Sequence, residues 1–311
     1  AEKFDHFRYK NHRFYVMDDY SKTVHVFSDE GKFLHCIGSK GQGPKEFYWC
    51  YQLVVDEHSL YILDMQNRIK KYDLEGNWIK DIKLTKQPYR LLFLGNGKMA
   101  CYISDDQFPK KEDAYSWLVL DAEGDSLTCI NTNAWRENKV MQNYWVENEF
   151  STQYPMTYKE AYNDSLYYFM PDSYQPVAYG VILPGKHQLS PNLTWEEIKN
   201  VKHGLRISYI YDTSRYLILN YKCLCTEDIQ EVLLGAFDKK TGEFFHIFNK
   251  NGEPKITNDL GGPDFTLLAC VYPNLLIGIA EANMCSEEFV QKYQMRGDDN
   301  QVLVMMECRQ R

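Results

Sequence analysis

A unit of about 45 residues occurs twice in succession near the start of the chain, and it constrains the fold more than any other feature. The first copy runs from Arg13-Phe-Tyr-Val-Met-Asp-Asp19 through Val24-His-Val-Phe-Ser-Asp-Glu-Gly31 to Phe33-Leu-His-Cys-Ile37. The second runs from Leu60-Tyr-Ile-Leu-Asp64 through Ile69-Lys-Lys-Tyr-Asp-Leu-Glu-Gly76 to Trp78-Ile-Lys-Asp-Ile82. Short apolar stretches bounded by Asp and Gly turns, repeated at this period, indicate the blades of a β-propeller.

Four further copies follow with decreasing similarity, over residues 98–130, 165–182, 215–248 and 274–306. The turn before the last strand ends in glycine, which supplies the positive φ of a tight hairpin, at Gly31, Gly76, Gly124 and Gly242. One small twisted sheet cannot bury both of its faces alone, whereas six arranged together can. The sequence therefore predicts one all-β domain over residues 1–311, a six-bladed β-propeller of four-stranded antiparallel blades.

Two stretches depart from the strand pattern and are expected to be insertions at one rim, over about 131–152 and 190–203. In the second, Thr194 fits an N-cap with Glu197 three residues on, which predicts a short helix. Cys285–Tyr293 is a second candidate helix.

Composition narrows the classes of partner. A formal net charge of −8 over 311 residues argues against a nucleic-acid binder and against adsorption to an anionic membrane surface. No run of 18 apolar residues is present, which argues against a bilayer-spanning helix. The chain opens at Ala1-Glu-Lys-Phe4 without an initiator Met or a signal peptide, and we interpret it as a trimmed chain.

The nine cysteines are expected to be mostly buried small hydrophobic residues, because most of them stand among apolar residues on predicted strands. Nine is an odd number, so at least one thiol is unpaired, and disulfide pairing among the rest stays open. Cys223-x-Cys225 is the only close pair, and no second Cys or His pair at zinc spacing accompanies it.

Three motifs carry a family resemblance. Ile37-Gly-Ser-Lys-Gly-Gln-Gly-Pro-Lys-Glu-Phe47 follows the last strand of the first copy, and Ile256-Thr-Asn-Asp-Leu-Gly-Gly-Pro-Asp-Phe265 and Asp299-Asn-Gln-Val-Leu-Val-Met-Met306 come later. Together they resemble the six-bladed β-propeller lipoprotein family of Bacteroidetes, which is similar to NHL-repeat and TolB-like propellers. The family more often has Asn-Pro where Asn300-Gln301 stands here.

The resemblance implies export to the periplasm or the cell surface, usually as a lipid-anchored precursor. Contact with the membrane would then come only through an anchor outside this chain. The family also begins with a segment upstream of residue 1, which would add a strand to the last blade. No particular activity is implied.

Gly38–Phe47 is not a phosphate-binding loop, because Gly43 is followed by Pro44 rather than by Lys-Ser/Thr and a helix. We interpret it as a glycine-shaped link from the first blade to the second. In a propeller such links cross the top face near the central channel, where ligands often bind. Topology therefore predicts ligand-binding residues on three links, namely Lys40, Gln42, Lys45, Glu46 and Tyr48, then Lys86, Tyr89 and Arg90, and finally Asn258 and Asp259.

Asp18, Asp19 and Asp64 end the second strand of the first two copies, which suggests a carboxylate ring for Ca²⁺ of the kind that NHL-like lactone hydrolases use. At this position the later copies carry Ser104, Pro171, Tyr221 and Glu281. The ring is therefore broken, and we predict turn-forming aspartates that bond their own backbone and no metal or other cofactor.

No catalytic set emerges from the sequence. The eight histidines make no His-x-x-x-His pattern, and no Gly-x-Ser-x-Gly elbow is present. His25 and His35 are expected to face solvent or to pack between blades. A glycosidase pair of carboxylic acids, distant in sequence, stays open.

Aromatic residues are abundant, with 24 Tyr, 16 Phe and 6 Trp, and most are expected to fill the wedges between blades. Trp135, Tyr144 and Trp145 lie in the irregular insertion, where no strand explains them, so they form a candidate aromatic surface for sugars or peptides.

These features favour an extracytoplasmic, non-catalytic binding protein that uses the top-face loops of a propeller. Its partner would be a protein, peptide or glycan of the cell envelope. The alternative is a propeller hydrolase or lyase acting on a sugar derivative at a channel metal site. A third reading, assembly into an envelope complex, would require a large exposed apolar patch.

Overall fold

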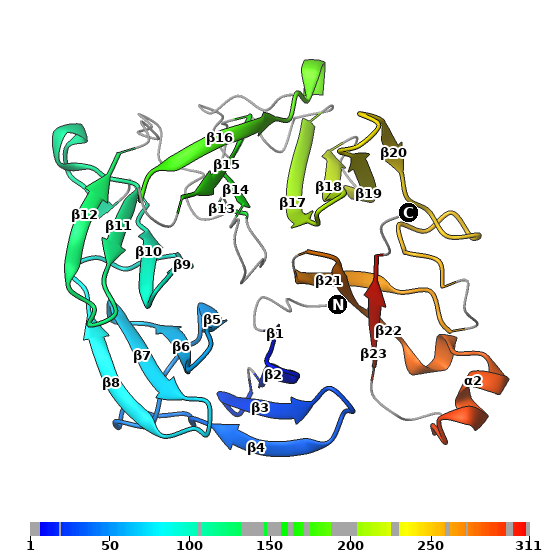
Figure 1. The fold of residues 1–311 in the computed structure, drawn as a ribbon, viewed down its shortest axis with the longest axis horizontal. Helices are drawn as coiled ribbons and strands as arrows, with labels where there is room; N and C mark the ends of the chain where they lie inside the picture. The colour runs from blue at the N-terminus through cyan, green and yellow to red at the C-terminus, as the bar shows by residue number, and fades with distance from the viewer. Residues whose placement is uncertain are drawn as a thin grey trace. The chain divides into compact units, whose positions relative to one another are not determined.

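The computed structural model describes residues 7–18, 20–104, 107–131, 146–147, 157–160, 164–170, 174–187, 204–224, 230–258, 262–271, 273–296 and 301–308. Its strands form six antiparallel sheets of three or four strands, and helix is limited to short segments (Figure 1). The predicted fold class, all-β with six blades, is therefore confirmed. The chain divides into two compact units, each described by itself below.

The first unit comprises residues 1–146, 154–182 and 191–195 and holds four sheets whose strands follow one another in chain order. The first sheet contains β1 (Phe7–Lys10), β2 (Arg13–Asp18), β3 (Thr23–Ser28) and β4 (Phe33–Ile37). The second contains β5 (Gln52–Val55), β6 (Ser59–Asp64), β7 (Arg68–Asp73) and β8 (Trp78–Lys83). The third contains β9 (Arg90–Gly95), β10 (Lys98–Tyr102), β11 (Trp117–Leu120) and β12 (Ser126–Ile130), with the 3₁₀ turn η2 (Lys111–Asp113). The fourth contains β13 (Val146–Glu147), β14 (Thr157–Glu160), β15 (Ser165–Phe169) and β16 (Pro176–Val181).

The second unit comprises residues 147–153, 183–190 and 196–311. Its first sheet contains β17 (Gly204–Asp212), β18 (Tyr216–Leu224), β19 (Gln230–Asp238) and β20 (Phe244–His246). Its second contains three strands, β21 (Thr266–Val271), β22 (Leu275–Ala280) and β23 (Val302–Glu307), where the repeat predicts four. The remaining elements are η4 (Gly185–His187), η5 (Ala282–Met284) and α2 (Glu287–Lys292).

The helix predicted near Cys285–Tyr293 is confirmed as α2. Its N-cap is Ser286, whose hydroxyl oxygen accepts a hydrogen bond from the Phe289 N–H at 3.2 Å. Of the two predicted insertions, 131–152 and 190–203, the structure describes residues 131, 146 and 147. The predicted helix at Thr194 lies outside the described residues.

The turns join strands three and four where the repeat predicts them. Between β3 and β4, Gly31 has a φ of +81°, which an L residue adopts only at a cost, and its N–H donates to the Ser28 carbonyl at 3.0 Å. Between β7 and β8, the Asp73 carboxylate accepts the N–H groups of Glu75 and Asn77 at 3.0 and 2.7 Å. Local hydrogen bonding therefore sets the hairpins and, with them, the register of the outer strands.

Successive sheets of the first unit pack through alternate residues of the same strand. On β6, Leu60 and Ile62 join a core with Tyr15, Val24 and Val26 of the first sheet. Their neighbours on β6, Tyr61 and Leu63, join a separate core with Met99, Cys101 and Leu118 of the third sheet. Because side chains alternate across a strand, a strand buried on both sides carries apolar residues at successive positions, as Leu60–Leu63 do, and every residue of β6 is buried.

Aromatic rings fill the space between the third and fourth sheets, as expected. Trp117 is fully buried, and its ring lies 4.8 Å from that of Tyr158 and 4.9 Å from that of Phe169, both edge-on. Edge-to-face contacts of this kind add to the free energy of burial.

Burial of tyrosine hydroxyls in these cores predicts a loss of stability in alkali. Burial, and next the nearby Asp56 carboxylate, raises the pKa of Tyr61 well above its usual value of 10.0. Because the pKa of Tyr61 is higher in the folded chain than in the unfolded chain, ionisation of Tyr61 favours unfolding. The contribution of the protonated Tyr61 to stability is therefore full below about pH 10 and is lost as the pH rises further. We expect the free energy of unfolding, measured in urea, to fall above about pH 10.

Tyr61→Phe should make that fall less steep, because it removes one of the groups whose ionisation the fold opposes. Tyr20→Phe is the matched control, since the Tyr20 side chain is 93% exposed. An unchanged slope in Tyr61→Phe would contradict the assignment.

Candidate functional site

The link between the first two sheets is held in one shape by its own backbone. The Gly41 N–H donates to the Phe47 carbonyl at 3.1 Å, and the Phe47 N–H donates to the Ser39 carbonyl at 3.0 Å. The Glu46 carboxylate, one of the predicted ligand-binding groups, accepts the Gly43 N–H at 2.8 Å. The Phe47 ring is fully buried in the core between the two sheets. The link is thus an ordered loop anchored at its far end.

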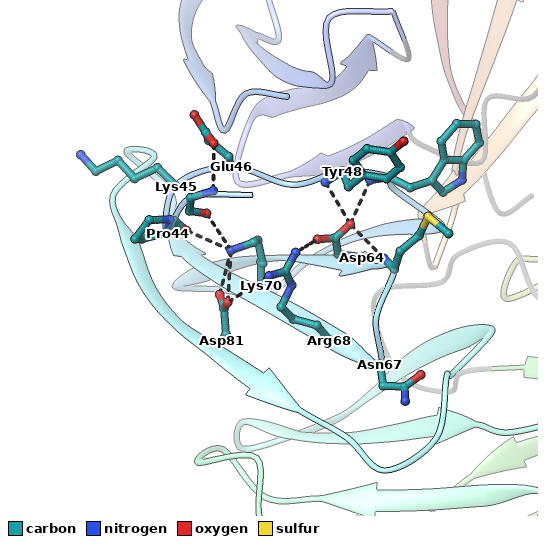
Figure 2. A network of polar contacts seen from close by, with 12 residues as sticks. Pro44, Lys45, Glu46, Tyr48, Asp64, Asn67, Arg68, Lys70 and Asp81 are labelled. Carbon is teal, nitrogen blue, oxygen red and sulfur yellow. Dashed lines mark hydrogen bonds and ion pairs between the residues drawn. The ribbon is translucent and has the colours of Figure 1, made fainter. Parts of the chain in front are cut away.

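A buried carboxylate at the end of β6 fixes the next part of the link. Asp64 is fully buried, and its Oδ1 accepts the backbone N–H groups of Tyr48, Trp49 and Met65 at 3.1, 2.9 and 2.9 Å. Its Oδ2 is ion-paired with the Arg68 guanidinium on β7 (Figure 2). As predicted, Asp64 bonds its own backbone at Met65, but it also binds two residues of the neighbouring link. Asp18 likewise accepts the Tyr20 N–H at 2.9 Å.

A buried lysine fixes the middle of the link. Lys70 has no exposed side-chain surface, and its Nζ donates to the Pro44 carbonyl at 3.0 Å and the Gly43 carbonyl at 3.3 Å. It also contacts both carboxylate oxygens of Asp81, at 3.0 and 3.2 Å (Figure 2). Lys70 and Asp81 stand directly opposite one another on β7 and β8, so the register of the sheet creates the pair.

The next link, between the second and third sheets, is tied to the same turn by glutamine side chains. Gln87 Nε2 donates to the Asp64 carbonyl at 3.2 Å, and Gln87 Oε1 accepts the Asn67 N–H at 2.8 Å. Gln107 Oε1 in turn accepts the Gln87 backbone N–H at 2.8 Å, and Gln107 Nε2 donates to the Gln87 carbonyl at 2.6 Å. The two links therefore lie on the same face, joined through the β6–β7 turn.

The three residues whose backbone N–H groups bind Asp64 have exposed side chains. The Tyr48, Trp49 and Met65 side chains, called the Tyr48–Trp49–Met65 patch below, are 48%, 45% and 36% exposed. Their backbone nitrogens all donate to one carboxylate oxygen, which fixes the spacing of the three Cα atoms. The buried Lys22 lies beneath, with its Nζ 4.0 Å from the centroid of the Trp49 ring. The patch is apolar, preorganised and open to solvent.

The predicted ligand-binding residues fall into three groups. Lys40, Gln42 and Lys45 are exposed on the first link, next to Tyr48 and Glu46. On the second link the polar groups bond locally: Lys86 Nζ donates to the Gln107 carbonyl at 2.6 Å, and Arg90 Nη1 donates to the Tyr89 carbonyl at 3.0 Å. The structure thus brings the first two links together.

The other predicted residues belong to the second unit or lie outside the described residues. Asn258 belongs to the second unit, where its N–H donates to the Asp264 carboxylate at 3.0 Å. Asp259, Trp135, Tyr144, Trp145 and Asp19 lie outside the described residues. Among the residues that the structure does describe, no group of three or more His, Cys, Asp or Glu side chains is placed to hold a metal ion.

Sequence reasoning missed Trp49 and the charged residues that hold the link. One signal was available for Arg68 and Lys70. They alternate with Ile69 on a central strand, and such strands rarely carry two charges on one face unless each is paired. Trp49 carried no such signal, because an aromatic residue beside a strand is ordinarily part of the packing.

The chain matches the family described as "Domain of unknown function (DUF4934)" over residues 2–307. It belongs to that family. No curated protein matches it.

Two solved structures share the fold. One is titled a "putative exported protein" of Bacteroides fragilis NCTC 9343, at 15% identity and a TM-score of 0.69, over 97% of this chain and 90% of that one. The other is a member of the DUF4221 family from Bacteroides vulgatus ATCC 8482, at 12% identity and a TM-score of 0.59, over 97% of this chain and 92% of that one. At these identities the likeness shows the fold alone.

Gly38 starts the link and should tolerate no side chain. Its φ is +72°, and a Cβ there would lie 2.5 Å from Cε1 of the buried Phe47 ring. Gly31 is a matched control with a φ of +81° and no atom within 4 Å of an added Cβ. We expect Gly31→Ala to cost about 1 kcal/mol of unfolding free energy and Gly38→Ala about 2–4 kcal/mol, measured in urea. Equal costs would show that the Phe47 ring does not confine the link.

Removing the Lys70 ammonium should destabilise the fold strongly. Lys70→Met keeps the length of the side chain but takes the ammonium away from two link carbonyls and from the Asp81 carboxylate, which keeps only the Trp78 indole N–H and the Arg68 guanidinium. We expect a loss of about 3–5 kcal/mol in unfolding free energy, the usual cost of removing one partner of a buried ion pair. The control is Lys83→Met, because Lys83 is exposed on β8. A loss no greater than that of the control would contradict the role given to Lys70.

Proposed function

We propose that this chain is a non-catalytic binding protein and that the Tyr48–Trp49–Met65 patch is its contact surface. The observation that supports it is that one buried carboxylate binds the backbone N–H groups of three residues whose largely apolar side chains are exposed. Rigid, partly exposed Tyr and Trp side chains provide large contact areas with little loss of conformational entropy on binding. Lys40, Gln42 and Lys45 are exposed hydrogen-bond donors on the same link as Tyr48.

A binding role fits the chemistry of the groups beneath the patch better than catalysis does. Asp64 is occupied by three backbone N–H groups and the Arg68 guanidinium, and Lys70 by Asp81 and two carbonyls. A general acid or base must exchange a proton with a bound substrate, and these groups are instead committed to positioning the loop. What the site offers a ligand is shape, apolar area and a few exposed donors.

We further propose that the protein acts outside the cytoplasm, in the periplasm or at the cell surface, on a protein, peptide or glycan of the envelope. One structure with the same fold is titled an exported protein, which supports export of this chain. A lipid anchor outside this chain, as in the NHL- and TolB-like propeller lipoproteins that it resembles, would hold it at the membrane. Within the described residues, no helix is long and apolar enough to cross a bilayer.

The patch can be tested by binding. The labelled chain is screened against arrays of envelope glycans and of peptides, and the affinity for each hit is measured by calorimetry. We expect Trp49→Ala and Tyr48→Ala each to weaken binding by about tenfold or more, the usual effect of truncating an aromatic anchor.

Phe33→Ala is the control, because Phe33 is a 51% exposed aromatic residue on β4, away from the link. Undiminished binding by both patch variants would place the contact surface elsewhere. Chemical conversion of a bound ligand would overturn the non-catalytic assignment.

A further inference from the structure

A thiol, an imidazole and a carboxylate stand in line on the outer strands of the first sheet, apart from the Tyr48–Trp49–Met65 patch. Cys36 on β4 and His25 on β3 are directly opposite one another in the ladder. The Cys36 Sγ lies 3.5 Å from the His25 Nδ1, and the His25 Nε2 lies 3.9 Å from the Asp18 Oδ2 at the end of β2. This is the order nucleophile, base and orienting carboxylate.

The carboxylate is itself held in place. Asp18 Oδ2 accepts the Ser21 hydroxyl at 2.6 Å, and Oδ1 accepts the Tyr20 N–H at 2.9 Å. These two hydrogen bonds lower the pKa of Asp18, so the group is negatively charged at neutral pH. A negative charge near Nε2 favours the tautomer with its proton on Nε2, which leaves Nδ1 free to accept the thiol proton.

The thiol is open to solvent. Cys36 is exposed, and the His25 and Asp18 side chains are 35% and 41% exposed. The remaining ring contacts of His25 are with the uncharged rings of Phe27 and Phe33, at centroid distances of 6.5 and 6.2 Å. A dissolved reagent can therefore approach the sulfur.

The repeat supplies a matched cysteine that lacks this arrangement. Cys36 is the fourth residue of β4 (Phe33–Ile37), and Cys129 is the fourth residue of β12 (Ser126–Ile130). Both are free and exposed, but the residue opposite Cys129 is Leu118 rather than a histidine. Burial of its surroundings raises the pKa of the Cys129 thiol. Two equivalent thiols in one molecule therefore differ in the group that could take their proton.

We propose that Cys36 is a reactive thiol, activated by His25, that undergoes thiol–disulfide exchange with small disulfides. His25 Nδ1 takes the proton from Sγ, and the thiolate attacks one sulfur of the disulfide R–S–S–R. A Cys36–S–S–R bond forms as the original S–S bond breaks, and the departing R–S⁻ takes the proton from the imidazolium. Cys36 is oxidised and the disulfide is reduced. Disulfides suit this surface because their leaving group is a thiolate, which departs without further catalytic help.

Oxidised glutathione is the probe for this site. The intact folded chain, reduced beforehand, is incubated with it near neutral pH, and the mixed disulfide at each cysteine is followed over time by mass spectrometry of peptides. We expect Cys36 to react about threefold to tenfold faster than Cys129, because an imidazole stands opposite Cys36 to take its proton and a leucine stands opposite Cys129. A Cys36 rate no higher than the Cys129 rate would overturn the proposal.

Two histidine variants test the role of His25. His25→Ala should lower the Cys36 rate by about threefold or more and change its dependence on pH, because no imidazole then takes the thiol proton. His35→Ala is the control, because His35 adjoins Cys36 in sequence but its Nε2 faces the Leu74 carbonyl of the second sheet at 3.0 Å. If His25→Ala reacts like the unaltered chain with the same pH profile, the proposal is wrong. The urea midpoint of each variant confirms that a slow rate does not reflect unfolding.

Discussion

The link between the first two sheets is held by the hydrogen bonds and ion pairs that the buried charges of Asp64 and Lys70 require. An ionised carboxylate away from water is costly unless hydrogen-bond donors and a counter-charge surround it. Asp64 obtains its donors from three separate backbone positions, two of them on the link from the preceding sheet, and its counter-charge from Arg68. Lys70 obtains its acceptors in the same way, from the link and from Asp81. In this conformation of the link, each of the four charged groups has a partner of opposite charge.

Such a network contributes more to geometry than to net stability. Desolvation offsets most of the attraction between buried ions, and apolar residues of similar size often serve the fold equally well. Apolar contacts, however, are compatible with many positions of the link. A carboxylate that must receive three N–H hydrogen bonds is compatible with few. We infer that the charges serve to hold the Tyr48, Trp49 and Met65 backbone at a fixed spacing, which a ligand can recognise without first ordering the loop.

Much of the fold was predictable from the sequence, and the site only in part. The alternation of apolar residues along a strand and the glycine of a turn are local features of the sequence. The strands and hairpins can therefore be predicted from short segments such as Val24–Gly31. The link and Tyr48 were found from topology alone. Trp49, Lys70 and Asp81 were not, because their roles depend on which residue stands opposite which, and that register is a property of the assembled sheet. The last sheet has three strands where the repeat predicts four.

The repeat also shows where to look for chemistry in a fold that by itself implies none. Positions that several copies share, such as the turn glycines of four of the six copies, are explained by the geometry of a hairpin. Positions where one copy differs from its equivalents need another reason. Asp64, Arg68 and Lys70 occur together only in the second sheet of the described structure, and they carry the link. His25 stands where the third sheet has Leu118, and it changes the surroundings of a cysteine that both sheets possess. Packing would be served by an apolar residue at either place, so these departures are the residues that function, rather than folding, best explains.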